Sequence, residues 1–121
     1  MEDVKNIHIS AKATEIAEII KEHFYFKNLN EVLRFALSLS LRDYLNEIDF
    51  DILESQYDSN GANYNTGSID SDDSVFRTII PMLIPDCQTP YRFARIAIIY
   101  GLYKIDEMMN NDSAFNIASL M

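Results

Sequence analysis

The residue types that most often carry chemistry are few and scattered in this chain of 121 residues. The two histidines, His8 and His23, fall on different expected elements, and the single cysteine, Cys87, cannot build a structural zinc site. The acidic runs around Asp58 and Asp70 lack the glycine and the glutamate that a calcium loop places at its sixth and twelfth positions. We therefore expect neither a metal nor another cofactor.

The sequence supports neither nucleophilic catalysis nor a phosphate-binding loop. Cys87 lies in an expected turn without a histidine nearby in sequence, and no serine stands in a nucleophile-elbow pattern. The three glycines, Gly61, Gly67 and Gly101, match neither the phosphate-binding loop nor the dinucleotide-binding fingerprint. The sequence predicts a protein that is not an enzyme.

Two arginines, Arg34 and Arg95, are the most informative charges, because they occupy matching places on two otherwise apolar helical segments. In one interpretation each pairs with a carboxylate beside the core. In the other, both face a common groove and bind an acidic partner or a phosphate, assisted by Arg42, Arg92 and Lys104. The sequence leaves both interpretations open.

The segments that carry these arginines look like two copies of one unit. Residues 28–41 and 89–102 superpose after a shift of 61 positions (from 34 to 95), and each copy has a helix cap before it. Apolar positions repeat with the same shift, and three identities coincide: Arg34 with Arg95, Ala36 with Ala97 and Leu41 with Leu102.

The repeat predicts a mostly α-helical single domain, built as a tandem strand–helix–helix repeat that forms a single-chain pseudo-dimer with a minor β ribbon. The expected units span residues 5–45 and 64–109; an acidic polar loop at 46–63 joins them, and a tail at 110–121 docks on the body or on a partner.

In the first unit, Ile7 and Ile9 alternate with Asn6, His8 and Ser10, which indicates a short strand with one polar face. The second strand is expected at 64–69.

Helices are expected after each strand and over 28–45 and 90–109. The helix before residue 90 should have an apolar face, acids at 70–74 near its positive end, and an early stop at Pro81. That apolar face comprises Val75, Phe76, Ile79, Ile80, Leu83 and Ile84.

The net charge of −9 argues against nucleic acid as a partner, because DNA-binding domains normally carry a basic footprint. No apolar run is long enough for a membrane span, and the charged N-terminus does not resemble a secretion signal. With one cysteine, these features favour a reducing, cytoplasmic environment.

Residues 5–45 resemble the ribbon-helix-helix family, in which paired strands insert their outward side chains into the DNA major groove. The resemblance implies DNA contacts by Asn6, His8 and Ser10. On the second strand the matching positions, Asn65, Gly67 and Asp70, depart from that pattern because they are poor readers of DNA.

The stretches 58–70 and 75–83 are similar to the middle of the DndE family of bacterial DNA sulfur-modification proteins. That resemblance implies an oligomeric, DNA-associated accessory without a catalytic centre.

Our leading hypothesis is a non-enzymatic protein-interaction subunit of a bacterial multi-protein system, with DNA modification or defence as its setting. The long helices carry more apolar surface than a chain this small easily hides, so we expect a protein partner, a homo-oligomer, or both. The alternative is a ribbon-helix-helix-type DNA-binding protein or transcriptional regulator.

Overall fold

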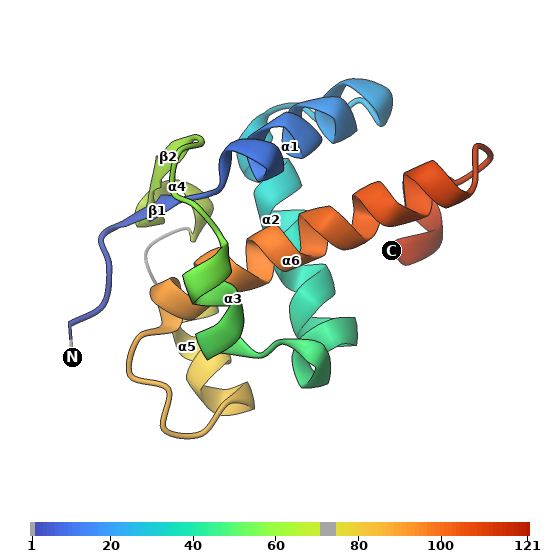
Figure 1. Cartoon of the computed structure of the whole chain (residues 1–121). Coiled ribbons are helices and arrows are strands. Elements are labelled where there is room, and N and C mark those ends of the chain that lie inside the picture. The colour runs from blue at the N-terminus through green and yellow to red at the C-terminus, as the bar shows by residue number, and fades with distance from the viewer. Residues whose placement is uncertain (1, 71–74) are drawn as a thin grey trace.

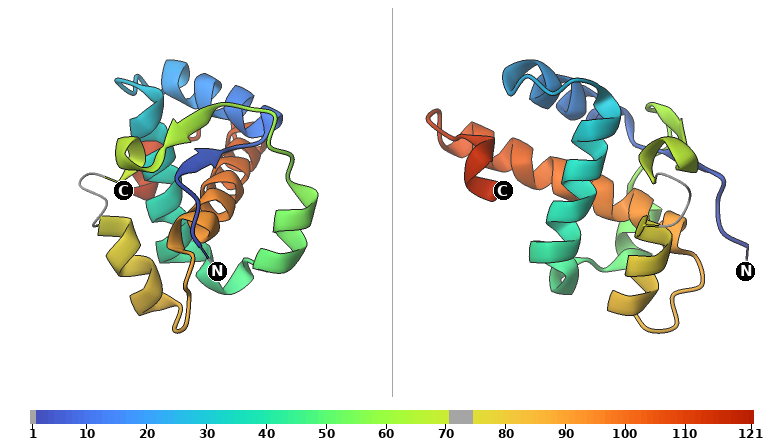
Figure 2. Two further views of the ribbon diagram at one scale, coloured as in Figure 1. Left: turned by 90° about the vertical axis from the view of Figure 1, so that its left-hand side faces the viewer. Right: turned by 180° about the vertical axis from the view of Figure 1, so that it is seen from behind.

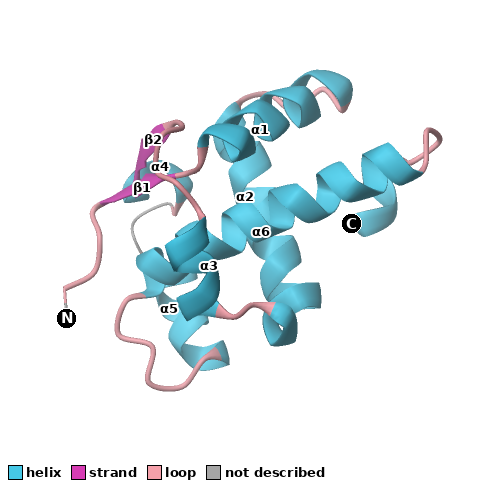
Figure 3. Cartoon of the chain, in the orientation of Figure 1, coloured by secondary structure: helices cyan, strands magenta, loops and turns pink. Residues whose placement is uncertain are grey.

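The computed structural model describes residues 2–70 and 75–121, and it is built mostly of helices with a small antiparallel ribbon at one end (Figures 1 and 3). The expected class, mostly α with minor β, is confirmed. No helix in these two ranges is both long and apolar enough to cross a bilayer.

The first half follows its sequence signals closely. Strand β1 (Asn6–His8) buries Ile7, and Ser10 then caps helix α1 (Ala11–His23) by accepting a hydrogen bond of 3.1 Å from the backbone N–H of Ala13. Helix α2 (Leu29–Leu39) begins after Asn28, whose side chain accepts from the backbone N–H of Glu31. Local capping therefore sets both helix starts.

The helix expected over 28–45 changes type at residue 40. A π-helical turn, η1 (Ser40–Tyr44), follows α2, and a 3-10 turn, η2 (Leu45–Glu47), follows η1. The change begins where the buried Ser40 hydroxyl donates a hydrogen bond of 2.6 Å to the carbonyl of Ala97 on another helix. A tertiary contact thus lies at the point where the regular helix ends.

The loop expected over 46–63 contains a further helix, α3 (Phe50–Gln56). Asp49 caps it by accepting from the backbone N–H of Ile52 at 3.3 Å. The Phe50 ring stacks on Phe93 with the centroids 6.0 Å apart. This aromatic contact lies between segments distant in sequence, so local periodicity did not predict it.

The second strand is shorter than the predicted 64–69. Strand β2 (Asn63–Asn65) pairs antiparallel with β1, and Ile7 lies opposite Tyr64. The Asn65 side chain then accepts from the backbone N–H of Gly67 and starts the one-turn helix α4 (Thr66–Ile69). Side-chain capping by Asn65 therefore ends the strand four residues early.

The second half continues with helix α5 (Val75–Leu83) and the long helix α6 (Pro90–Asn111). Asp70 is buried and accepts hydrogen bonds from the first backbone N–H groups of α5. This agrees with the acidic residue expected near the positive end of the helix. The rest of the expected acidic start, 71–74, lies outside the described residues. Pro81 stands in the last turn of α5, which ends two residues later.

Helices α2 and α6 make the most extensive contact in the fold, and they cross near the middle of the molecule (Figures 1 and 2). Gly101 of α6 faces the backbone of Ala36 so closely that a Cβ atom at this position would collide with the Ala36 carbonyl oxygen. The C-terminal segment folds back beside α6, where its 3-10 turn η4 (Ile117–Leu120) buries Ile117. The tail therefore docks on the body.

Several features of the two halves are separated by the 61 residues of the expected repeat. Helix α2 begins at Leu29 and α6 at Pro90, and the turn before each contains a residue with positive φ, Tyr25 (60°) and Asp86 (69°). Helix α4 has no counterpart in the first half. The tandem-repeat pseudo-dimer itself stays a prediction.

Candidate functional site

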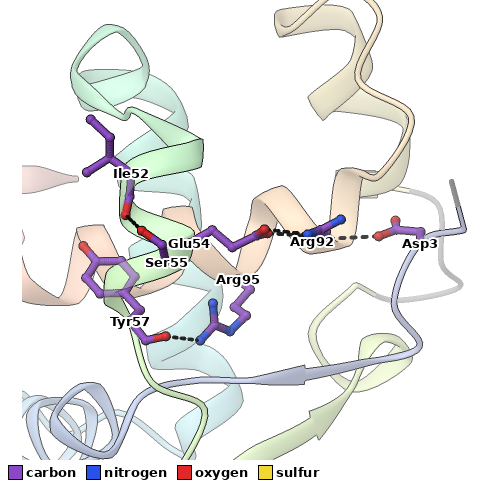
Figure 4. A network of polar contacts seen from close by, with 7 residues as sticks. All are labelled: Asp3, Ile52, Glu54, Ser55, Tyr57, Arg92 and Arg95. Atoms are coloured by element: carbon purple, nitrogen blue, oxygen red, sulfur yellow. Dashed lines mark hydrogen bonds and ion pairs between the residues drawn. The ribbon is translucent and has the colours of Figure 1, made fainter.

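Arg92 is engaged in a polar network that fastens α3 to α6 (Figure 4). Its guanidinium donates two hydrogen bonds to the Glu54 carboxylate, from Nε at 2.6 Å and from Nη2 at 2.5 Å. These hydrogen bonds with Glu54, with the carboxylate charge, raise the pKa of Arg92. Asp3 reaches the same turn and accepts from the backbone N–H groups of Tyr91 (2.8 Å) and Arg92 (3.0 Å). The side chain of Arg92 therefore joins α6 to α3, and Asp3 joins the N-terminal residues to the start of α6.

Arg95 forms a second internal clamp. Its guanidinium donates to the carbonyl oxygens of His8 (2.6 Å), Asp58 (2.7 Å) and Tyr57 (3.2 Å), and to the hydroxyl of Ser59 (3.0 Å). Burial lowers the pKa of Arg95. The side chain fixes the loop after α3 against the end of β1. Backbone carbonyls hold it, which neither sequence interpretation anticipated.

Arg34, at the matching place on α2, has a different environment. It is half-buried, and no acceptor in 2–70 or 75–121 takes a hydrogen bond or ion pair from its guanidinium. One turn earlier, the buried Oδ1 of Asn30 has no hydrogen-bond partner in the same ranges either. Arg42 forms an exposed ion pair with its neighbour Asp43 at 2.8 Å. No hydrogen bond of the described chain therefore joins these arginines into one site.

Lys104 is enclosed by side chains of its own chain. Its ammonium lies 5.4 Å from the ring centroids of Tyr44 and Tyr100, 3.6 Å from Glu47 and 4.0 Å from Glu107. Burial lowers the pKa of Lys104, but the negative groups around the ammonium outweigh burial and raise it overall. The lysine thus links α6 to η2.

The outer face of the ribbon presents four exposed polar side chains. Asn6 and His8 come from β1, and Asn65 and Asn63 lie directly opposite them on β2. The antiparallel register therefore gathers three amides and one imidazole on a single narrow face.

The other predicted strand contacts do not reach this face. Ser10 is buried, and its hydroxyl caps α1 and lies 3.2 Å from the Tyr103 hydroxyl. Gly67 belongs to α4, and Asp70 is buried beneath α5, where the Tyr91 hydroxyl donates to it at 2.8 Å. The expected place of Ser10 on the outward face of the strand is wrong, and so is the placement of Gly67 and Asp70 on the second strand.

Carboxylates of the chain itself occupy three helix N-termini, which are the backbone sites best suited to a phosphate. Asp3 lies at α6, Asp70 at α5, and Asp58 at α1, where it accepts from the backbone N–H of Ala11 at 3.0 Å. Hydrogen bonds from Ala11 and Asn60 lower the pKa of Asp58. These helix starts are therefore negative where a nucleic acid would need them positive.

Helix α5 exposes part of the apolar face that the sequence predicted for it. Val75, Ile79, Met82 and Leu83 lie on one side of the helix, with exposed fractions between 38% and 75%, while Ile80 is buried. Figure 1 places α5 at the periphery, next to the start of α6. The apolar pattern predicted the helix but not which of its faces would be covered.

A groove of about 410 Å³ lies between α3, η2 and the turn from α5 to α6. Leu45, Phe50 and Phe93 give it an apolar lining, and Asp51 and Asp86 are its charged lining residues. Neither carboxylate has a hydrogen bond or ion pair with the part of the chain that the structure describes. Sequence reasoning missed this groove because its lining comes from two segments that are distant in sequence, 45–51 and 84–93.

Within the described ranges, no cluster of three or more histidine, cysteine, aspartate or glutamate side chains is arranged to hold a metal ion. No protein-family model, curated protein or solved structure gives a significant match to this chain.

Proposed function

We propose that this protein is a non-enzymatic interaction subunit of a bacterial multi-protein system. The observation that carries the proposal is the exposed apolar face of α5. Four large apolar side chains on one side of a nine-residue helix form a patch of the kind that marks protein interaction sites.

Comparison of α5 with helix α1 of the same chain supports this interpretation. It occupies the matching place before the first helix–helix turn, and its outer face carries Glu15, Glu18 and Glu22, all exposed. After the shift of 61 residues, Glu18 corresponds to Ile79. A helix in this position is stable with a solvated polar face, so the apolar face of α5 is better explained by a partner.

The charges favour a protein over nucleic acid. Arg92, Arg95 and Lys104 are held by internal groups, and acids occupy three helix starts. The setting we propose, DNA modification or defence, rests on the resemblance to the DndE family.

We also propose that the two halves form the expected single-chain pseudo-dimer. At the crossing, the Ala97 carbonyl accepts from Ser40, and the Ala36 carbonyl abuts Gly101. Shifting Ala36 and Ser40 by 61 residues gives Ala97 and Gly101, so the contact has the reciprocity of a two-fold axis.

Photo-crosslinking in the native cells tests the interaction function. The crosslinker p-benzoylphenylalanine replaces Met82 on α5 in one variant and Glu18 on α1 in the control variant. We expect a discrete adduct with another protein from position 82 and none from position 18. No adduct from position 82, or the same adducts from both positions, would contradict the proposal.

A second candidate, a ribbon-helix-helix-type DNA-binding protein or regulator, is favoured by the outer ribbon face. Asparagine can bond an adenine edge through two hydrogen bonds, and Asn6 and Asn65 lie side by side. A gel-shift assay at low and moderate salt tests it. Tight duplex binding that the double variant Asn6→Ala/Asn65→Ala abolishes would place this candidate first. Binding weaker than about 10⁻⁴ M at physiological salt is the result we expect.

A further inference from the structure

The groove and the exposed face of α5 are adjacent parts of one end of the molecule. Leu83 is the last exposed apolar residue of α5, and the next two residues, Ile84 and Pro85, line the groove. Helices α5 and α3 both contact α6, and Figure 2 shows the turn after α5 leading into the start of α6. An extended or helical ligand that covers α5 can therefore also place a side chain in the groove.

The charges at this end are arranged for a cation. Asp51 and Asp86 line the groove, and both are exposed. Within 2–70 and 75–121 neither carboxylate accepts a hydrogen bond or forms an ion pair, and the internal cation that Asp51 acts on is Arg92, which Glu54 already binds. Asp86 also has a φ of 69°, a left-handed conformation that L-residues rarely adopt outside turns. Glu54 and Asp58 already have partners within the chain, because Glu54 is bound to Arg92 and Asp58 to backbone N–H groups.

A second copy of this chain is a poor occupant. Each copy carries a net charge of −9, and like charges of that size oppose association. Helix α5 itself contributes only one charged residue, Arg77, so a contact between two α5 faces would leave the carboxylates of the groove unpaired.

We infer that the α5 face and the groove together bind a basic amphipathic segment of a partner protein. The apolar side of that segment packs on Val75, Ile79 and Met82, and its lysine or arginine side chains pair with Asp51 and Asp86. This is the helix-in-groove mode of recognition, in which spaced apolar anchors give affinity and flanking charges give specificity. The inference rests on the proposed interaction function and names the chemistry of the partner.

Fluorescence anisotropy with a defined probe tests the inference. The probe is a labelled helical peptide of about 18 residues, or five turns, with leucine along one face and lysine elsewhere. A twin peptide carries glutamate in place of lysine. The intact chain is titrated at about 0.15 M salt, where long-range attraction between exposed charges is largely screened.

Two matched double variants separate the groove from general acidity. Asp51→Asn/Asp86→Asn removes two charges in the groove, and asparagine tolerates the left-handed conformation at position 86. Glu15→Gln/Glu22→Gln removes two charges from the outer face of α1. We expect the groove variant to weaken binding of the lysine peptide about tenfold, as two partly exposed ion pairs should, and the α1 variant less than about twofold.

The glutamate twin tests whether the charge of the peptide matters. If the twin binds more weakly than the lysine peptide, the inference is supported, whereas equal binding of both peptides overturns it. Equal losses in the two double variants, or no saturable binding of the lysine peptide, also overturn it. A dimer in light scattering that Met82→Gln dissociates identifies a second copy as the occupant and overturns it too. If the peptide fails but the crosslink from position 82 persists, the interaction function stands without this partner chemistry.

Discussion

Replacing Gly101 with alanine tests the close crossing of α2 and α6, on which the whole arrangement depends. An added Cβ would collide with the carbonyl oxygen of Ala36 and lie 2.7 Å from the Ser40 hydroxyl oxygen. The Ala36 oxygen belongs to the backbone of a helix and cannot rotate aside. The two helices must therefore separate to accept the methyl group.

Two opposing contributions decide whether Gly101→Ala raises or lowers the free energy of unfolding. Glycine inside a helix is less favourable than alanine by about 1 kcal/mol, so the substitution alone would stabilise α6. Overpacking a core costs about 1–3 kcal/mol, and loss of the buried hydrogen bond from Ser40 to the Ala97 carbonyl costs about 1 kcal/mol more. The net expectation is a lower free energy of unfolding by about 1–3 kcal/mol.

Urea unfolding, followed by the helical circular dichroism signal, measures this difference. Ser40→Ala is the matched control, because it removes the hydroxyl without adding atoms and should cost only about 1 kcal/mol. The urea dependence should be unchanged in both variants if unfolding exposes the same surface. A Gly101→Ala variant as stable as the original chain, or more stable, would refute the close crossing described here.

Three further predictions concern the ribbon, the core and the N-terminal arm. Gly61→Ala should lower the free energy of unfolding by at least about 1–3 kcal/mol in urea titrations, because its Cβ would collide with the Thr14 hydroxyl and the backbone after β1. Burial raises the pKa of Tyr57 to about 12, so its contribution to stability is complete below its unfolded pKa near 10 and is lost as the pH rises towards 12. After solvent screening this loss should be about 1 kcal/mol, and comparison with Tyr57→Phe across that pH range should show it as an alkaline decline absent from the variant. Asp3→Ala should lower the melting temperature by removing about 1 kcal/mol of capping at α6, while Asp3→Asn, which keeps an acceptor, should lose less.

Local signals predicted much of the fold because they act over a few residues. Ser10 and Asn28 cap the helices that follow them, and the Thr89–Pro90 pair stands where α6 begins. The alternation around Ile7 predicted β1, and the helix expected after that strand is α1. Capping and periodicity need only neighbouring atoms, so no knowledge of distant segments was required.

The candidate site was less predictable from sequence. The arginines and the lysine were chosen by type and spacing, but spacing does not reveal that Arg95 would meet three carbonyl oxygens or that Lys104 would lie between two tyrosine rings. The apolar residues of α5 were identified, yet their periodicity carries no information on which side neighbouring helices would cover. The groove at Asp51 and Asp86 had no local signal.

The sequence by itself therefore determined where most helices start, which residues are apolar, and the absence of a local catalytic motif, because each of these depends on adjacent residues. Only the tertiary structure decided the strand register, the close approach at Gly101 and the capping of α6 by Asp3, 88 residues away from Tyr91. Those contacts form when distant segments fill one core, where close packing selects among arrangements that are locally equivalent.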